Sequence, residues 1–242
     1  MERRSKYVGT RFHPCQAGSM ATKRRRGERR TDSLSKERIV EAAMKILDAQ
    51  GEEALTFRAL ATRLETGSGA IYWHVASKDE LLAAITNDVI AGVMAKVVSS
   101  AKPREAIRKI ALGVFDAIDA HPWIGAQLSR EPWHAAMVQI FEGVGGQLQA
   151  LGVPKRSQFH CASALVNYVL GLAGQYAAGA RLLPREMDRT TFLTTVAARW
   201  SQLDAAKFPF MHQVAKQLPK HDDREQFLAG IDLILAGVAT VR

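Results

Sequence analysis

From Ser35 to the C-terminus, apolar residues recur every three or four positions, which is the spacing of one face of an α-helix. No stretch alternates apolar and polar residues as a half-buried strand does, and there is no Asn-Gly hairpin signal. Beyond residue 100, the prolines stand far enough apart to leave long helices between them. The pattern therefore predicts an all-α fold, with later helices over about 104–119, 123–130, 133–151, 155–181, 187–206 and 222–240.

The composition allows a compact core, and the charge is unevenly placed. Hydrophobic residues make up 47% of the 242 residues and charged residues 24%. Residues 1–30 hold ten Lys and Arg against two Asp and Glu, and so carry +8 of the net charge of +9. We expect residues 1–34 to be a basic disordered tail that either lies along DNA or is a solvated extension, with Met20 as a second candidate start of translation.

The cysteines and apolar runs limit the class of protein. Cys15 and Cys161 lie far apart and outside any Cys-x-x-Cys pair, which argues against a zinc site and a disulfide framework. The first residues lack the apolar stretch of a secretory signal, and the low-charge run over 161–180 is too interrupted to cross a membrane. These features predict a soluble cytoplasmic protein with no metal, no cofactor and no membrane partner.

Residues 35–83 carry four helical patterns. Three of them begin at residues that suit an N-cap: Ser35, Thr56 and Ser77. A break at 65–67 separates the helix after Thr56 from a third, short helix over 68–75. Helix, tight turn and short helix make a helix-turn-helix, in which the second helix of the motif enters the major groove of DNA.

The third helix has an outward face that contact with water alone does not explain. Ile71 and Val75 are four residues apart and face inward, so Trp73 and small residues point outward. Such a face suits base edges and sugars better than solvent. We therefore expect a DNA-binding domain over 35–83 and a larger helical domain over 84–242.

The run from Leu60 to Leu82, LATRLETGSGAIYWHVASKDELL, resembles the DNA-binding signature of the tetracycline-repressor (TetR) family of transcriptional regulators. The resemblance covers about residues 36–83. It implies a homodimer that reads a palindromic double-stranded DNA operator, with a pocket for a small-molecule effector in the larger domain. Carried over position by position, it assigns to the bases Arg58, Ser68, Gly69, Ala70 and Trp73. It assigns to the phosphates Tyr72, His74 and Lys78, with Thr56 also at the DNA surface.

Three positions depart from the family pattern. Glu65 stands at the turn where the family usually has Gly, so either a left-handed backbone there is strained or the turn differs in shape. Ala70 offers no hydroxyl where a polar residue is common. Thr66 replaces a usual buried aliphatic residue. Tyr72 and Trp73 also have a plainer interpretation as packing aromatics, and His74 as a hydrogen-bonded surface histidine.

Large or polar residues on the apolar helices of the larger domain are the candidates for an effector site. They are Trp123, Trp133, His134, Phe141, His160, Asn167, Tyr168 and Gln175. Asn167 and Gln175 lie eight residues apart and would share a helix face, so they are the leading pair. Each of these residues, taken alone, is more often a packed aromatic or a satisfied polar group.

The helices over 155–181 and 222–240 are apolar on more than one face, so they need to be covered on both sides. The second cover is either another subunit or deep burial within the chain. With the first alternative, the sequence predicts a homodimeric, ligand-responsive transcriptional repressor.

The competing hypothesis is an architectural or protein-interaction helical module that binds DNA without an effector. An enzyme is not expected. His121, His134 and His160 form no metal-binding pattern, and the chain has neither a Gly-x-Ser-x-Gly elbow nor a glycine-rich phosphate loop after a strand.

Overall fold

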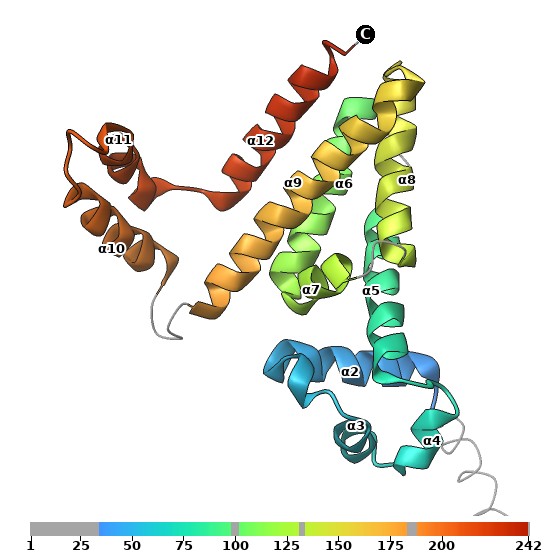
Figure 1. Ribbon diagram of the computed structural model, residues 1–242. Coiled ribbons are helices and arrows are strands. Elements are labelled where there is room, and N and C mark those ends of the chain that lie inside the picture. The colour runs from blue at the N-terminus through green and yellow to red at the C-terminus, as the bar shows by residue number, and fades with distance from the viewer. Residues whose placement is uncertain (1–33, 98–101, 131–133, 183–187, 242) are drawn as a thin grey trace, which may run out of the picture.

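The structure of the protein is a computed structural model that describes residues 34–97, 102–130, 134–182 and 188–241. The predicted basic tail, apart from Leu34, lies outside the described residues. Every element in the described part of the chain is a helix, which confirms the predicted all-α fold. A small N-terminal domain lies at one end of a larger helical domain, and helix α5 joins them (Figure 1). Within these ranges no helix has the length and apolar character that crossing a bilayer requires.

The small domain is built from short helices with well-defined starts. It contains α2 (Lys36–Gln50), the 3-10 turn η1 (Glu52–Ala54), α3 (Phe57–Arg63) and α4 (Ser68–Tyr72), and it ends in the first turns of α5 (Lys78–Ala95). All three predicted N-caps form, because each hydroxyl accepts a hydrogen bond from a backbone N–H three residues on: Ser35 from Arg38, Thr56 from Ala59 and Ser77 from Glu80. Each bond satisfies an N–H that a helix start leaves without a partner within the helix.

One apolar core connects the small domain to the base of α5. Ile39 of α2, Leu60 of α3 and Ile71 of α4 are buried in the same cluster as Leu82 of α5. Burial of these side chains removes apolar surface from water, which is the main favourable term in folding. Because α5 is continuous from residue 78 to 95, the domain boundary predicted at 83/84 falls inside it. A rigid helix therefore passes from one domain into the other.

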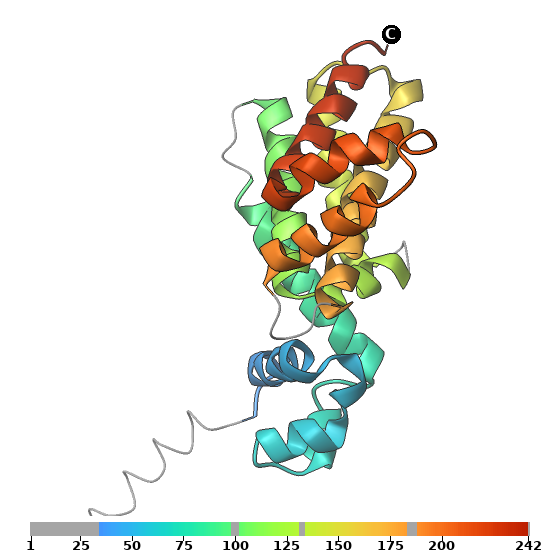
Figure 2. The ribbon, with the colours of Figure 1, turned by 90° about the vertical axis from the view of Figure 1, so that its left-hand side faces the viewer.

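The larger domain adds a bundle around an apolar interior. Its helices are α6 (Pro103–Ala120), α7 (Trp123–Arg130), α8 (Ala135–Ala150), α9 (Lys155–Leu182) and α12 (Asp223–Val238). Helices α6, α8 and α9 pack against one another, and α12 lies against α9 and α6 (Figure 2). The rings of Phe115 on α6 and Phe227 on α12 meet with their centroids 4.6 Å apart. These helices match the predicted ranges to within a few residues.

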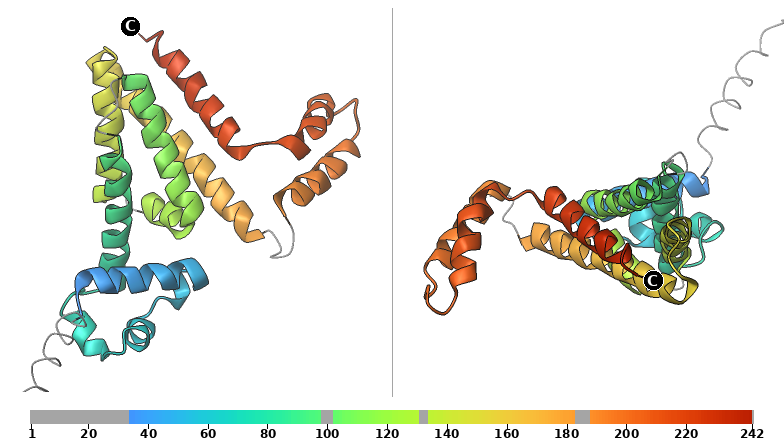
Figure 3. Two further views of the ribbon diagram at one scale, coloured as in Figure 1. Left: turned by 180° about the vertical axis from the view of Figure 1, so that it is seen from behind. Right: turned by 90° about the horizontal axis from the view of Figure 1, so that it is seen from above.

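The segment between α9 and α12 differs from the prediction. The helix expected over 187–206 is shorter, since α10 spans Arg189–Ser201, and two further elements follow it: α11 (Pro209–Gln217) and η2 (Leu218–Lys220). Pro209 was expected to break a helix but instead begins one, because the first helical position needs no N–H and suits the fixed φ of proline. Helices α10 and α11 pack on each other and project from the side of the larger domain (Figure 3).

Helices α9 and α12 each bury one face and expose another. On α12, Phe227 is fully buried whereas Leu233 is 74% exposed; on α9, Leu165 is buried whereas Ala164, Asn167 and Gly171 are exposed. These exposed faces exclude the alternative that both helices are buried deep within one chain.

Candidate DNA-binding face

The turn between α3 and α4 has the strained backbone that the sequence indicated. Glu65 adopts φ of 52°, and it is the only residue other than glycine with a positive φ in the described part of the chain. The N–H of Thr66 donates to the carbonyl of Ala61 at 3.0 Å, and the N–H of Glu65 donates to that of Thr62 at 3.4 Å. This pair of bonds is a Schellman motif, which ends α3 sharply and sets the direction of α4.

Helix α4 is anchored on one side and open on the other. Ile71 and Val75 are buried beneath it, as predicted. The Trp73 side chain is 90% exposed, so its core interpretation is wrong. The Tyr72 ring stacks on Phe57 with centroids 4.3 Å apart but remains 55% exposed, so it combines a packing contact with an accessible edge. The open side of α4 is therefore an aromatic surface with few side chains around it.

The other predicted DNA contacts from the motif are also accessible. Thr56, Arg58, Ser68, Gly69 and His74 are exposed, and Ala70 is half-buried. The hydroxyl of Thr56 caps α3 and so fixes the helix that carries Arg58. The pKa of Glu37 is lowered by hydrogen bonds from its own backbone N–H and from Ser35, with a smaller effect from the charge of His74.

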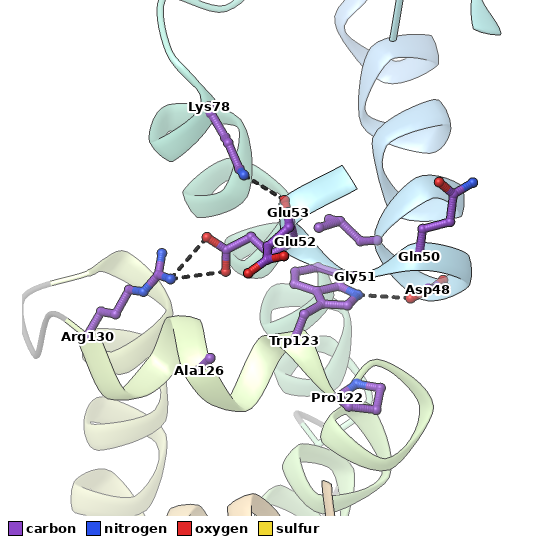
Figure 4. Close-up of a pocket in the computed structure, with 11 residues that line it drawn as sticks. Asp48, Gln50, Gly51, Glu52, Glu53, Lys78, Pro122, Trp123, Ala126 and Arg130 are labelled. Atoms are coloured by element: carbon purple, nitrogen blue, oxygen red, sulfur yellow. Dashed lines mark hydrogen bonds and ion pairs between the residues drawn. The ribbon is translucent and has the colours of Figure 1, made fainter. Parts of the chain in front are cut away.

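Lys78 is placed differently from the phosphate contact that the resemblance implies. Its side chain is half-buried, and its ammonium donates a hydrogen bond to the carbonyl oxygen of Glu52 at 2.6 Å (Figure 4). It lines a hollow of about 720 Å³ between the two domains. The reason is local geometry, since the start of α5 lies beside η1 and the carbonyl there offers the cation a partner within reach.

At this hollow, residues at the start of α7 in the larger domain form polar contacts with the end of α2. The indole N–H of Trp123 donates to the Asp48 carboxylate at 2.9 Å, and Nδ1 of His121 lies 2.8 Å from the same oxygen. Trp123, predicted to bind an effector, is thus buried in a contact between domains. The Asp48 carboxylate therefore contacts two ring nitrogens, one from His121 and one from Trp123.

A second carboxylate completes this contact. Arg130 donates from one nitrogen to both oxygens of Glu52, at 3.0 and 3.1 Å (Figure 4). Gln127 also donates to Glu52, at 3.0 Å. We call the polar set around both carboxylates the interdomain clamp: Asp48, Glu52, Lys78, His121, Trp123, Gln127 and Arg130. In the ranges that the structure covers, no three His, Cys, Asp or Glu side chains gather as a metal site.

Of the described residues predicted to bind an effector, Trp123 lines the hollow between the domains, and the others lie elsewhere. Asn167 and Gln175, the leading pair, are both exposed on α9. Tyr168 packs on Phe227 with ring centroids 5.7 Å apart and donates to its carbonyl at 3.2 Å. The remaining candidates are Phe141, which stacks on Phe159, His160, exposed on α9, His134, which precedes α8, and Trp133, which lies outside the described residues.

Comparison with known proteins gives one consistent result. The chain matches the family described as bacterial regulatory proteins, tetR family, over residues 39–85. It matches the tetracyclin repressor-like C-terminal domain over residues 102–242.

Two proteins of known structure have a similar fold over most of this chain. The transcriptional regulator SCO7222, a TetR from Streptomyces coelicolor, is 49% identical, with a TM-score of 0.78 over 86% of this chain and 99% of that one. ActR from the same organism, solved with actinorhodin, is 25% identical, with a TM-score of 0.69 over 85% and 95%. An HTH-type transcriptional regulator of Saccharopolyspora erythraea is 31% identical over 57% of this chain and 59% of its own length.

Proposed function

Because this chain belongs to the tetracycline-repressor (TetR) family of DNA-binding transcriptional regulators, we propose that it is a repressor that binds a palindromic operator as a homodimer and is released by a small-molecule effector. The observation that carries the proposal is the open face of α4, the second helix of the helix-turn-helix, where Trp73 at the end of the helix is 90% exposed.

Base readout is assigned to Arg58, Ser68 and Trp73. A guanidinium that pairs with a guanine edge discriminates by about 1–3 kcal/mol, and an indole face suits a thymine methyl group. A Cβ on Gly69 would meet nothing within 4 Å in this chain, so the fold itself does not require glycine there. Gly69 and Ala70 instead let the helix approach DNA closely, while Tyr72 and His74 lie at the edges, where phosphates pass.

The dimer is assigned to the exposed faces of α9 and α12. Leu233 of α12 is a large apolar side chain that one chain leaves exposed to water. The exposed faces of α9 and α12 also carry small residues, including Ala164, Gly171 and Gly237. Small residues let helices of two subunits approach closely, so that apolar surface is buried without voids. A symmetric pair would present two α4 helices to successive turns of one DNA face.

Two observations support release by an effector: a similar protein has been solved with a bound ligand, and helix α5 physically connects the larger domain to the DNA-binding domain. ActR has been solved with actinorhodin, at 25% identity to this chain. In this protein α5 and the interdomain clamp connect the bundle to the DNA-binding domain. A ligand that favours a different packing of α5, α6 or α7 would therefore change the separation of the two α4 helices.

Selection of operators from random duplex DNA tests the proposal. We expect a palindromic consensus, bound by a dimer in sedimentation experiments. Trp73→Ala should lower affinity for the selected site more than for random duplex. Phe210→Ala is the matched control, because Phe210 is a 70% exposed aromatic on α11 and should leave both affinities unchanged. A monomer that selects no duplex would overturn the proposal.

A further inference from the structure

Two spaces in the described part of the larger domain differ in size and position. The apolar cavity enclosed by α6, α8 and α9 has a volume of about 10 Å³, which is less than one water molecule needs. Between α5 and α6 lies a groove of about 510 Å³, within the usual range for small-molecule sites. Its walls include the half-buried side chains of Val89, Val93 and Leu112.

Two glycines create this groove. A Cβ on Gly113 of α6 would lie 2.5 Å from a methyl carbon of Val93, so α5 and α6 approach each other closely at that point. A Cβ on Gly92 of α5 would meet nothing within 4 Å. Gly92 therefore lines the groove with open space at its Cβ position, so we expect a large side chain there to occupy part of the groove.

The groove has ends of opposite charge. Val93 faces Gly113 and the two helices run in opposite directions (Figure 1), so Lys96 and Lys109 line one end while Asp88 and Asp116 line the other. Eight residues of helix separate Asp88 from Lys96, which corresponds to about 12 Å.

The cations at one end are available to a ligand, whereas an acid at the other end is already paired. Asp116 forms an ion pair with Arg224. Within the described ranges, Lys96 and Lys109 form no ion pair. An anion near these two ammonium groups gains charge-assisted hydrogen bonds without displacing a protein carboxylate. A second anionic group about 12 Å away would instead approach Asp88.

We infer that the α5–α6 groove binds a small amphipathic monocarboxylate, with its carboxylate between Lys96 and Lys109 and its apolar body along Val89, Val93 and Leu112. A ligand seated there pushes against α5, which carries buried Leu82 of the DNA-binding domain. The effect on DNA rests on the proposed function, whereas binding in the groove does not.

Titration calorimetry with decanoate, below its micelle concentration, tests the site in the full-length protein. We expect saturable binding that falls about tenfold in the Lys96→Gln/Lys109→Gln double variant, because each exposed ion pair contributes a few-fold. Gly92→Leu should abolish binding while the helical circular dichroism is retained. Gly145→Leu, at a helical glycine on α8 that also has open space, should bind as the original chain does. Decanedioate, which carries a carboxylate at each end, should bind more weakly than decanoate.

The outcomes separate the site from the proposed function. Absent binding, or equal binding in all variants, overturns the groove as a site. Binding that follows the predicted order supports it even if the protein selects no operator, in which case the proposed function alone fails. Where an operator has been selected, its release by decanoate from the original chain, but not from Gly92→Leu, supports the groove as the regulatory site. Equal release from both overturns that role.

Discussion

The strained turn of the helix-turn-helix can be tested by one substitution, Glu65→Gly. A left-handed φ such as the 52° of Glu65 costs a residue with a Cβ about 1–2 kcal/mol. Glycine avoids that cost but loses about 0.5–1 kcal/mol more backbone entropy on folding. The side chain of Glu65 is exposed, so little packing is lost. We therefore expect Glu65→Gly to raise the free energy of unfolding by roughly 0.5–1 kcal/mol.

Thermal unfolding of the purified protein measures this effect. For a chain of 242 residues, about 1 kcal/mol moves Tm by roughly 2–4 °C, so the variant should melt about 1–4 °C higher. Glu65→Ala is the matched control, since it removes the same charge but keeps a Cβ, and its Tm should not rise. An equal rise in both variants would assign the gain to charge and refute the backbone argument.

Three further predictions concern the clamp and the dimer. Glu52→Gln should weaken operator binding several-fold, and adding Arg130→Gln should cost little more, because both changes break one contact; losses that add in full would contradict this. Lys78→Gln should lower Tm and leave the salt dependence of DNA binding unchanged, since the ammonium is bonded to the Glu52 carbonyl; a slope reduced by about 0.9 would instead reveal a phosphate contact. Leu233→Glu should yield monomers in sedimentation, whereas Val138→Glu, at another exposed apolar residue, should not; a dimeric Leu233→Glu would place the interface elsewhere.

Local features of the fold were predictable because they depend on neighbours in sequence. The hydroxyls of Ser35, Thr56 and Ser77 each bond to an N–H three residues away, so the residue type and its position are enough to predict a helix start. The apolar period identified the inward faces, and the departure at Glu65 indicated strain at the position where φ is positive.

The interdomain clamp was missed because it depends on distant pairs. Asp48 and Trp123 lie 75 residues apart, and nothing in the sequence around Trp123 indicates that its indole N–H donates to a distant carboxylate. The packing of the Tyr168 ring on Phe227 also joins residues that are far apart in sequence. The only local signal for the clamp was the acidic end of α2 and η1, which is equally typical of a solvated surface.

The energy of the clamp is compatible with the proposed release by an effector. Its contacts are partly exposed ion pairs and hydrogen bonds, which contribute about 0–1 and 0.5–1.5 kcal/mol each, and so a few kcal/mol together. Allosteric coupling between two sites is typically 1–3 kcal/mol, which is of the same order. Under the proposed function, a ligand that favours another position of α5 has to supply only a free energy of this size. The apolar part of the contact adds to that requirement, because Trp123 is buried in the same cluster as Ile39, Leu60 and Leu82.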